Sequence, residues 1–212
     1  MLTRKSKPHA PLGTFTILAI SPDSNLMGVA TASGSTNVGD RVPHAKPGVG
    51  VIATQAYTNI AYGVKGLKLL EQGLSPEHAL VKLLMEDSER NMRQVAIMDF
   101  KRRKAVFTGS NVPEFWAEVV GEDYIVVGNL LSTKNVVNSI AKEFEVSKGS
   151  LVLRMAKALQ VGSKSGGDKR GERSAALMVI SNEKVEIEIK VGMHAQPIEE
   201  LLRLLKSQSV QC

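Results

Sequence analysis

The chain has 212 residues, a length typical of one domain, and its 43% apolar and 23% charged residues are ordinary for a soluble globular protein. The net charge of +6 lies in local clusters without interleaved aromatic residues, which favours a solvated basic surface over a nucleic-acid interface. The only cysteine is Cys212, which excludes a disulfide framework and a thiolate metal site, and no apolar stretch is long enough to span a membrane. We therefore expect a cytoplasmic protein with neither a membrane nor a nucleic acid as its partner.

The start of the chain differs in character from the rest. It carries Arg4, Lys5 and Lys7 without an acidic residue, and two prolines interrupt it. It begins like a secretory signal but lacks the apolar region of one. We interpret residues 1–13 as a basic N-terminal extension or pro-segment, and residues 14–212 as a single domain.

The domain is predicted to begin with three strands. The stretches 14–21 and 26–33 are rich in β-branched and apolar residues and flank a Pro-Asp-Ser-Asn turn, so they form a hairpin. A loop punctuated by glycine and proline follows at 34–48, with room for a short strand near residues 41–42. Residues 49–56 are apolar almost throughout, which indicates a strand buried on both faces.

Two helices and a second hairpin follow. Leucines recur at helical intervals in 61–73, and the segment 75–87 has Ser75 as its N-cap and a proline in its first turn. The strands 93–100 and 104–109 are then predicted to pair across a basic turn. Hairpins of this kind build antiparallel sheets.

The second half of the chain again alternates strands and helices. Its predicted elements are a strand at 123–129, helices at 132–146 and 150–162, a polar glycine-rich loop at 163–172, a hairpin of 173–181 and 184–191, and a closing helix at 197–207. Consecutive helices suit layers that cover the faces of sheets. We therefore predict an α+β fold, a four-layer αββα sandwich of two mainly antiparallel sheets between helix layers.

Thr14, at the start of the first predicted strand, is the best candidate nucleophile. An N-terminal threonine can attack a carbonyl while its own α-amine, with an ordinary pKa of about 7.7–8.0, takes the hydroxyl proton. Gly13 allows the tight backbone that release of this amine by an N→O acyl shift requires. Lys46 is the cation that could lower the pKa of the amine. The alternatives are a threonine that merely starts a strand and a solvated loop lysine.

Polar residues follow two of the predicted strands. Backbone N–H groups and polar side chains after the buried strand can form an oxyanion hole or bind substrate. These candidates are Gln55, Tyr57, Thr58 and Asn59. Gly128 and Asn129 end the strand at 123–129, where glycine permits close approach and asparagine can donate to an oxyanion. For the group after the buried strand, the alternative is a loop with helix-capping residues.

The glycine-rich loop holds a third group of candidates. Asp168 and Ser174 could orient the nucleophile, and Arg170 could bind a substrate carboxylate, while the alternative is a charged surface loop. The four histidines show no ligand spacing, so we expect no metal site. The sequence has no P-loop, dinucleotide-binding fingerprint or Gly-x-Ser-x-Gly motif, and we expect no cofactor.

Several strings resemble the DUF1028 family over almost the whole chain from Thr14 to about Lys206. They are TFTILAISPDSNLMGVATAS, NVGDRVPHAKPGVGVIATQAYTNIAYGVKGLKLLEQGLSPEHAL, RQVAIMDF, VVGNLL and GGDKRGERSAALMV. This uncharacterised family is placed in the Ntn-hydrolase superfamily, whose fold is the αββα sandwich. Proteasome-like members of the superfamily use an N-terminal threonine with a lysine on a neighbouring strand, and the resemblance implies these roles for Thr14 and Lys46.

The chain departs from the family pattern in three places. Many family members begin almost at the Thr-Phe pair, whereas 13 residues precede it here. Lys46 and His44 stand where arginine and tryptophan are common. The string KVGMH lacks the paired aspartates that usually precede this histidine, so a role for those acids does not carry over.

Two main hypotheses about function follow. The first is an Ntn-type hydrolase that cleaves an amide bond in a small-molecule or peptide substrate, with Thr14 as nucleophile. The second is a non-catalytic binding or assembly module on an Ntn-like scaffold that keeps its leader. A nucleic-acid binder ranks third. We also expect a homo-oligomer, since most oligomeric proteins are built from identical subunits.

Overall fold

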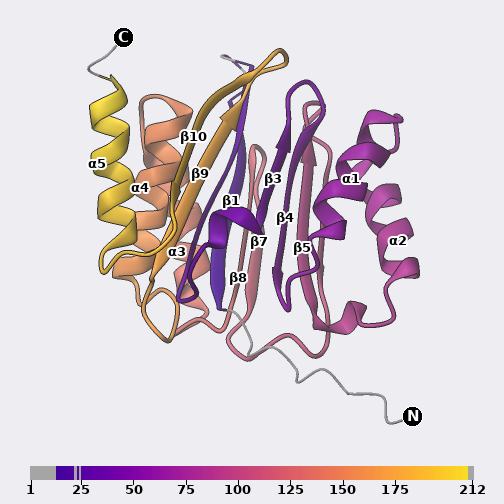
Figure 1. Cartoon of the computed structure of the whole chain (residues 1–212), viewed down its shortest axis with the longest axis horizontal. Helices are drawn as coiled ribbons and strands as arrows, with labels where there is room; N and C mark the ends of the chain where they lie inside the picture. The colour runs from indigo at the N-terminus through magenta and orange to yellow at the C-terminus, as the bar shows by residue number, and fades with distance from the viewer. Residues whose placement is uncertain (1–12, 22, 24, 210–212) are drawn as a thin grey trace.

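The computed structural model describes residues 13–21, 23 and 25–209. In this part of the chain, two antiparallel sheets stack face to face and helices cover the outer face of each sheet (Figure 1). The four-layer αββα sandwich predicted from the sequence is therefore confirmed. Apart from Gly13, the predicted basic extension lies outside the described residues, as do two residues of the first predicted turn.

The larger sheet has six strands. In chain order they are β1 (Thr14–Ser21), β2 (Leu26–Ser33), β7 (Ala117–Val120), β8 (Tyr124–Asn129), β9 (Ser174–Ile180) and β10 (Val185–Val191). Their spatial order is β10-β9-β2-β1-β8-β7, so β1 pairs with β2 on one side and with β8, from the second half of the chain, on the other. The first strand of the domain is thus an interior strand of the sheet.

The smaller sheet and the helices complete the sandwich. The sheet has the order β3 (Pro43–Lys46), β4 (Gly50–Ala56), β5 (Arg93–Asp99) and β6 (Lys104–Thr108). Its outer helices are α1 (Ala61–Glu71) and α2 (Pro76–Glu86), and those of the larger sheet are α3 (Asn135–Val146), α4 (Leu151–Lys164) and α5 (Pro197–Ser209). Two short 3-10 helices are η2 (Val38–Asp40) and η3 (Arg90–Met92). Across the described residues, none of these helices combines the length and the apolar character needed to cross a membrane.

Both faces of β1 are buried, because successive side chains of a strand point to opposite sides. Phe15 and Ile17 pack in the core under α3 and α4, whereas Leu18 and Ile20 pack in the core between the two sheets. A third apolar core lies between the smaller sheet and its helices α1 and α2. Each large apolar side chain buried in this way contributes about 1.5–3 kcal/mol to folding. These contacts fix which face of β1 each residue presents.

Two strands lie where the sequence does not predict them. β3 falls inside the predicted loop 34–48, just past the optional strand at 41–42, because pairing with β4 holds it extended although prolines flank it. β7 is a four-residue edge strand whose side chains are partly or fully exposed, so it lacks the apolar alternation that marks a strand. The other predicted strands and helices end within three residues of the observed bounds.

Candidate active site

A row of polar side chains crosses one end of the larger sheet. Four neighbouring strands, β9, β2, β1 and β8, place in register Ser174, Ser33, Thr14 and Asn129. Residues in register project from the same face of a sheet, and for this row it is the face toward the smaller sheet. All four residues are buried, and Thr14 is only 1% exposed. The structure thus brings together three residues singled out from the sequence, Thr14, Asn129 and Ser174.

The smaller sheet places a second polar row opposite the first. Gln55, Gln94 and Thr108 are in register on β4, β5 and β6. Gln55 bridges the two sheets, because its Oε1 accepts a hydrogen bond from Thr16 Oγ1 (2.7 Å) and its Nε2 donates to the Thr14 carbonyl (3.4 Å). This end of the space between the sheets is therefore polar, whereas the rest is filled by apolar side chains.

Hydrogen bonds fix the orientation of the Asn129 amide. The Gly128 carbonyl can only accept, so the Gln94 atom bonded to it (3.1 Å) is Nε2, which makes Gln94 Oε1 an acceptor. That oxygen accepts from Gln55 Nε2 (2.7 Å) and from Asn129 Nδ2 (3.1 Å). The Asn129 oxygen is buried and has no hydrogen-bond partner among the described residues. The Asn129 oxygen therefore offers an acceptor, which suits an N–H group, while its Nδ2 donates to Gln94.

The Thr14 hydroxyl lies against the peptide bond that precedes it. Thr14 Oγ1 is 2.6 Å from the Gly13 carbonyl oxygen and 3.3 Å from Ser33 Oγ. Since a C=O bond is about 1.23 Å long, Thr14 Oγ1 is within about 3.8 Å of the Gly13 carbonyl carbon. Ser33 Oγ donates to the same carbonyl oxygen (2.5 Å) and accepts from Ser35 N (3.1 Å). A hydroxyl nucleophile and a potential scissile bond are therefore neighbours.

Asp168 and Arg170, from the glycine-rich loop, meet the same peptide bond. The Asp168 carboxylate accepts from Arg170 Nε (3.0 Å), from Arg170 Nη2 (2.8 Å) and from Gly34 N (2.7 Å). Arg170 Nη2 also donates to the Gly13 carbonyl oxygen (3.2 Å). The Asp168 side chain is 0% exposed and that of Arg170 is 34% exposed. The acid is thus enclosed, while the cation lies between the peptide bond and the surface.

Ser174 supports the loop that follows β2. Its Oγ donates to the Ser35 carbonyl (2.6 Å) and accepts from Val38 N (3.1 Å). The same loop contains Gly34, whose N–H binds Asp168. Ser174 therefore holds the backbone of the loop that carries Gly34 and Ser35 beside the peptide bond before Thr14.

Lys46 does not lie beside Thr14. It pairs with Gly50 at one end of β4, whereas Gln55, which contacts Thr14, lies near the other end. The strand from residue 50 to residue 55 spans about 16 Å. The Lys46 ammonium instead forms a 2.6 Å ion pair with Glu71 of α1. The prediction of a lysine next to the nucleophile is wrong, because Lys46 lies on β3 of the smaller sheet, far along the strand direction from Thr14 on the larger one.

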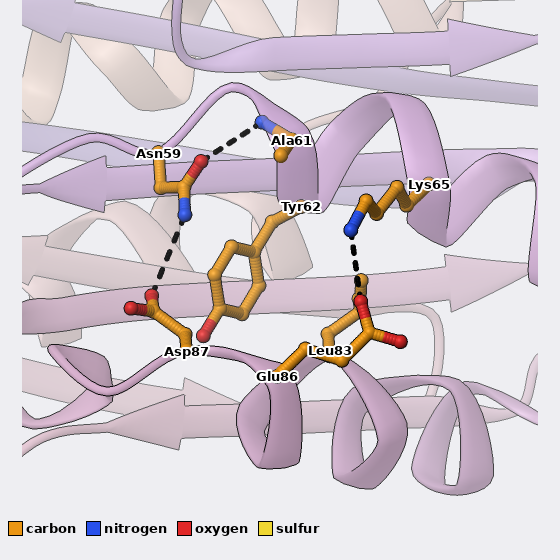
Figure 2. Close-up of a pocket in the computed structure, with 7 residues that line it drawn as sticks. All are labelled: Asn59, Ala61, Tyr62, Lys65, Leu83, Glu86 and Asp87. Carbon is orange, nitrogen blue, oxygen red and sulfur yellow. Dashed lines mark hydrogen bonds and ion pairs between the residues drawn. The ribbon is translucent and has the colours of Figure 1, made fainter.

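Tyr57, Thr58 and Asn59, in the loop between β4 and α1, face a different cluster. Tyr57 N donates to the Met92 carbonyl (3.2 Å), so this N–H already has an acceptor. Asn59 Oδ1 accepts from Ala61 N at the start of α1 (3.1 Å), and its Nδ2 lies 3.5 Å from Asp87 Oδ2, as Figure 2 shows. Thr58 Oγ1 is buried without a partner among the described residues. None of the hydrogen bonds described for these three residues reaches Thr14.

A buried ion pair anchors this loop. Arg93 Nε donates to Asp87 Oδ2 (2.9 Å), and both side chains are about 10% exposed or less. Burial by itself raises the pKa of Asp87, but hydrogen bonds from Arg93 and from Glu89 N, together with the Arg93 charge, lower that pKa to about 2. Burial, followed by the Asp87 charge, raises the pKa of the Tyr62 hydroxyl, which points toward Asp87 in Figure 2. The cavity here measures about 50 Å³, which is too small for an organic substrate.

Sequence reasoning does not single out several residues of the site, notably Ser33, Thr16 and Gln94. Each is a polar residue at an inward position of a strand that is largely apolar, and this was the signal available to find them. Within the described residues, no group of three or more histidine, cysteine, aspartate or glutamate side chains is arranged to hold a metal ion. The chemistry of this end of the sandwich therefore rests on hydroxyl, amide, carboxylate and guanidinium groups.

The chain has a close structural relative among solved proteins. A protein from Silicibacter pomeroyi assigned to DUF1028 is 30% identical, with a TM-score of 0.87 over 92% of this chain and 85% of that one. HslV from Trypanosoma brucei (12% identity, TM-score 0.45, 79% of this chain and 99% of that one) and Anbu from Yersinia bercovieri (12%, 0.42, 94% and 97%) are more distant. A comparison with functionally curated proteins found no match. The family model for DUF1028 matches residues 14–201, and the chain therefore belongs to this family of unknown function.

Proposed function

We propose that the chain is an amide hydrolase of the N-terminal-nucleophile type, in which Thr14 attacks the substrate once the bond between Gly13 and Thr14 has been cut. The observation that carries the proposal is the 2.6 Å contact between the Thr14 hydroxyl and the Gly13 carbonyl oxygen at the start of an interior strand. The substrate is a small-molecule or peptide amide, and the reaction uses no cofactor.

The surroundings of Thr14 suit an α-amine that acts as the base. Cutting the bond creates this amine, whose ordinary pKa of about 7.7–8.0 lets it take the hydroxyl proton and return it to the leaving group. The Asn129 oxygen, in register with Thr14 and without a partner among the described residues, supports an acceptor role toward the amine. A Cβ placed on Gly13 would be 2.5 Å from Asp168 Oδ2, so this carboxylate also lies close to where the ammonium would form.

The test of this proposal uses the full-length chain. Intact-mass measurement is expected to find a species that begins at Thr14, and a β-lactone probe is expected to acylate Thr14 in that species. The Thr14→Ala chain should stay full length and unlabelled. Thr133→Ala, at an exposed threonine outside the site, is the matched control and should behave as the wild type. A wild-type chain that stays full length and takes up no probe contradicts the proposal.

The alternative is a binding or assembly module without turnover. In the uncut chain the Thr14 nitrogen is an amide, which cannot serve as a base, and the Thr14 side chain is buried. Both facts favour this alternative for as long as the leader stays attached. Light scattering on the uncut chain tests the expected self-association. An unchanged ligand-induced melting shift in Thr14→Ala would favour this alternative over the hydrolase.

A further inference from the structure

We infer that Arg170 and Ser33 activate the Gly13 carbonyl for self-cleavage of the bond between Gly13 and Thr14, with Asp168 as the residue that positions Arg170. This inference deepens the proposed function and rests on it. Arg170 then has a role in the chain's own maturation, which differs from the binding of a substrate carboxylate predicted from the sequence.

Three groups donate to the Gly13 carbonyl oxygen. They are Ser33 Oγ (2.5 Å), Thr14 Oγ1 (2.6 Å) and Arg170 Nη2 (3.2 Å). Ser33 has a single proton, which goes to this carbonyl, and its oxygen accepts from Ser35 N (3.1 Å). Thr14 Oγ1 also lies within donating distance of Ser33 Oγ, 3.3 Å away, and this is the direction in which its proton leaves during the proposed attack. Once the proton turns from the Gly13 carbonyl to Ser33 Oγ, a lone pair of Thr14 Oγ1 is free to face the carbonyl carbon.

Asp168 fixes the guanidinium in the orientation that this role needs. It binds both Arg170 Nε and Arg170 Nη2, the fork geometry that holds a guanidinium plane in place. The carboxylate is itself held by Gly34 N (2.7 Å) and by the backbone N–H of Arg170 (2.9 Å). Arg170 Nη2 therefore bridges the carboxylate and the Gly13 carbonyl, and it is pre-positioned before any negative charge develops on that oxygen.

The proposed reaction needs only water as a co-reactant. Thr14 Oγ1 bonds to the Gly13 carbonyl carbon and gives its proton to Ser33 Oγ. Negative charge develops on the carbonyl oxygen during this step, and Ser33 then gives its own proton to that oxygen. The C–N bond then breaks, and the proton on the former carbonyl oxygen passes through Ser33 to the Thr14 nitrogen, which leaves a Gly13 ester on Thr14 and a free amine. Water hydrolyses the ester to a Gly13 carboxylate and restores the Thr14 hydroxyl.

The test measures the first-order rate of cleavage, by intact mass, in full-length chains refolded from denaturant. Loss of one preorganised donor to a developing oxyanion costs about 10²–10³-fold in rate, and this slowing is expected for Arg170→Gln and for Ser33→Ala. Arg170→Lys keeps the positive charge but loses the two-point hydrogen bonding of the guanidinium with Asp168. Its cleavage rate should therefore fall between those of Arg170→Gln and the wild type. Lys169→Gln, at the exposed neighbouring residue, is the matched control and should cleave as the wild type.

Two further readouts separate a chemical role from a structural one. Asp168→Asn should slow cleavage. The double variant with Arg170→Gln should be no slower than Arg170→Gln alone, because Asp168 acts on cleavage through its hydrogen bonds to Arg170. Hydroxylamine traps the ester, so it should yield the leader hydroxamate with the wild type and almost none with Arg170→Gln.

Where Arg170→Gln does not fold, ethylguanidinium added to folded Arg170→Ala should restore cleavage.

The outcomes distinguish the inference from the proposed function. Wild-type rates in folded Arg170→Gln, or no recovery of folded Arg170→Ala with ethylguanidinium, overturn the role of Arg170 and leave Thr14 as the nucleophile. A wild-type chain that never cleaves overturns the proposed function itself. Slow cleavage of Arg170→Gln, Ser33→Ala and Asp168→Asn, together with wild-type cleavage of Lys169→Gln, supports the inference.

Discussion

Gly13 lies against a carboxylate that leaves no room for a side chain. A Cβ at this position would be 2.5 Å from Asp168 Oδ2 and 2.8 Å from its Cγ, distances that real Cβ contacts do not reach. The carboxylate is held by Arg170 and Gly34 and so cannot simply move aside. Gly34 on the other side is almost as close, with a Cβ position 2.8 Å from Asp168 Oδ1. The two glycines therefore permit the ion pair of Asp168 and Arg170 to contact the peptide bond before Thr14.

Gly13→Ala is expected to slow cleavage at least tenfold and to lower the free energy of unfolding by about 1–3 kcal/mol, because the new methyl group displaces Asp168 and with it Arg170. Intact mass and urea unfolding measure the two effects. Gly171→Ala is the control, since no atom lies within 4 Å of a Cβ there; its positive φ costs some stability but should leave cleavage unchanged. Cleavage of Gly13→Ala at the wild-type rate would contradict this role of Asp168.

At the scale of elements, Arg93 joins the ends of several segments. It begins β5, binds Asp87 just after α2, and donates through Nη1 to the Tyr57 carbonyl just after β4 (2.8 Å). Its neighbour Gln94 belongs to the polar network at Thr14. The ion pair therefore holds the helical layer and the smaller sheet together at the end of the sandwich where the candidate site lies.

The pKa of Asp87, about 2, makes this ion pair a source of pH-dependent stability. An unfolded aspartate has a pKa of about 3.9, so the contribution is present above that pH and is lost as the pH falls toward 2; its size near pH 7 is roughly 2–3 kcal/mol. Asp87→Asn should lose this stability at pH 7 and differ much less from the wild type near pH 2, as measured by urea unfolding. Glu86→Gln, which removes an exposed ion pair with Lys65, should change little at either pH. An equal loss for Asp87→Asn at both pH values would count against the ion pair.

The elements that the sequence predicts well have strong local signals. The hairpin of β1 and β2 has apolar strands around a turn, and α2 begins where Ser75 accepts a hydrogen bond from His78 N, as its N-cap position predicts. β3 and β7 lack such signals, since one is flanked by prolines and the other is an exposed edge. These two strands are stabilised by their partners β4 and β8, and a pairing partner cannot be read from the strand's own residues.

The site was only partly predictable for a similar reason. Thr14, Asp168 and Asn129 could be singled out by residue type and by their positions at strand ends or in a glycine-rich loop. Which of them meet depends on how the strands are distributed between two sheets, and this decides that Gln94 reaches Asn129 while Lys46 binds Glu71. The direction of the Asn129 amide depends on a chain of hydrogen bonds through Gln94 to the Gly128 carbonyl, which has no local signature.

At the scale of the whole molecule, the net charge of +6 comes in part from the basic cluster at residues 101–104. This cluster does not form a basic binding face. Arg102 forms ion pairs with Glu122 and Asp123, and Arg103 forms one with Asp99. Lys104 donates to two backbone carbonyls. The side chains of Arg102, Arg103 and Lys104 therefore already have acceptors within the protein.

We expect no measurable binding of a labelled DNA duplex or single-stranded RNA by fluorescence anisotropy, even at low salt, where phosphate contacts are strongest. Asp99→Asn removes the acidic partner of Arg103 and is the matched comparison, which should bind more than the wild type under the same conditions. Wild-type binding that weakens steeply with added salt would instead favour a nucleic-acid partner.

The residues around the bond before Thr14 come from widely separated parts of the chain, and Arg170 follows Gly13 by 157 positions. An incomplete or unfolded chain cannot assemble them, because β1, β2, β8 and β9 must first pair in register. Under the proposed chemistry, removal of the leader therefore shows that the two-sheet fold has formed in that chain. Intact mass would then separate chains that have completed folding from chains that have not. The fraction of cut chains at successive times would measure how fast the sheet assembles.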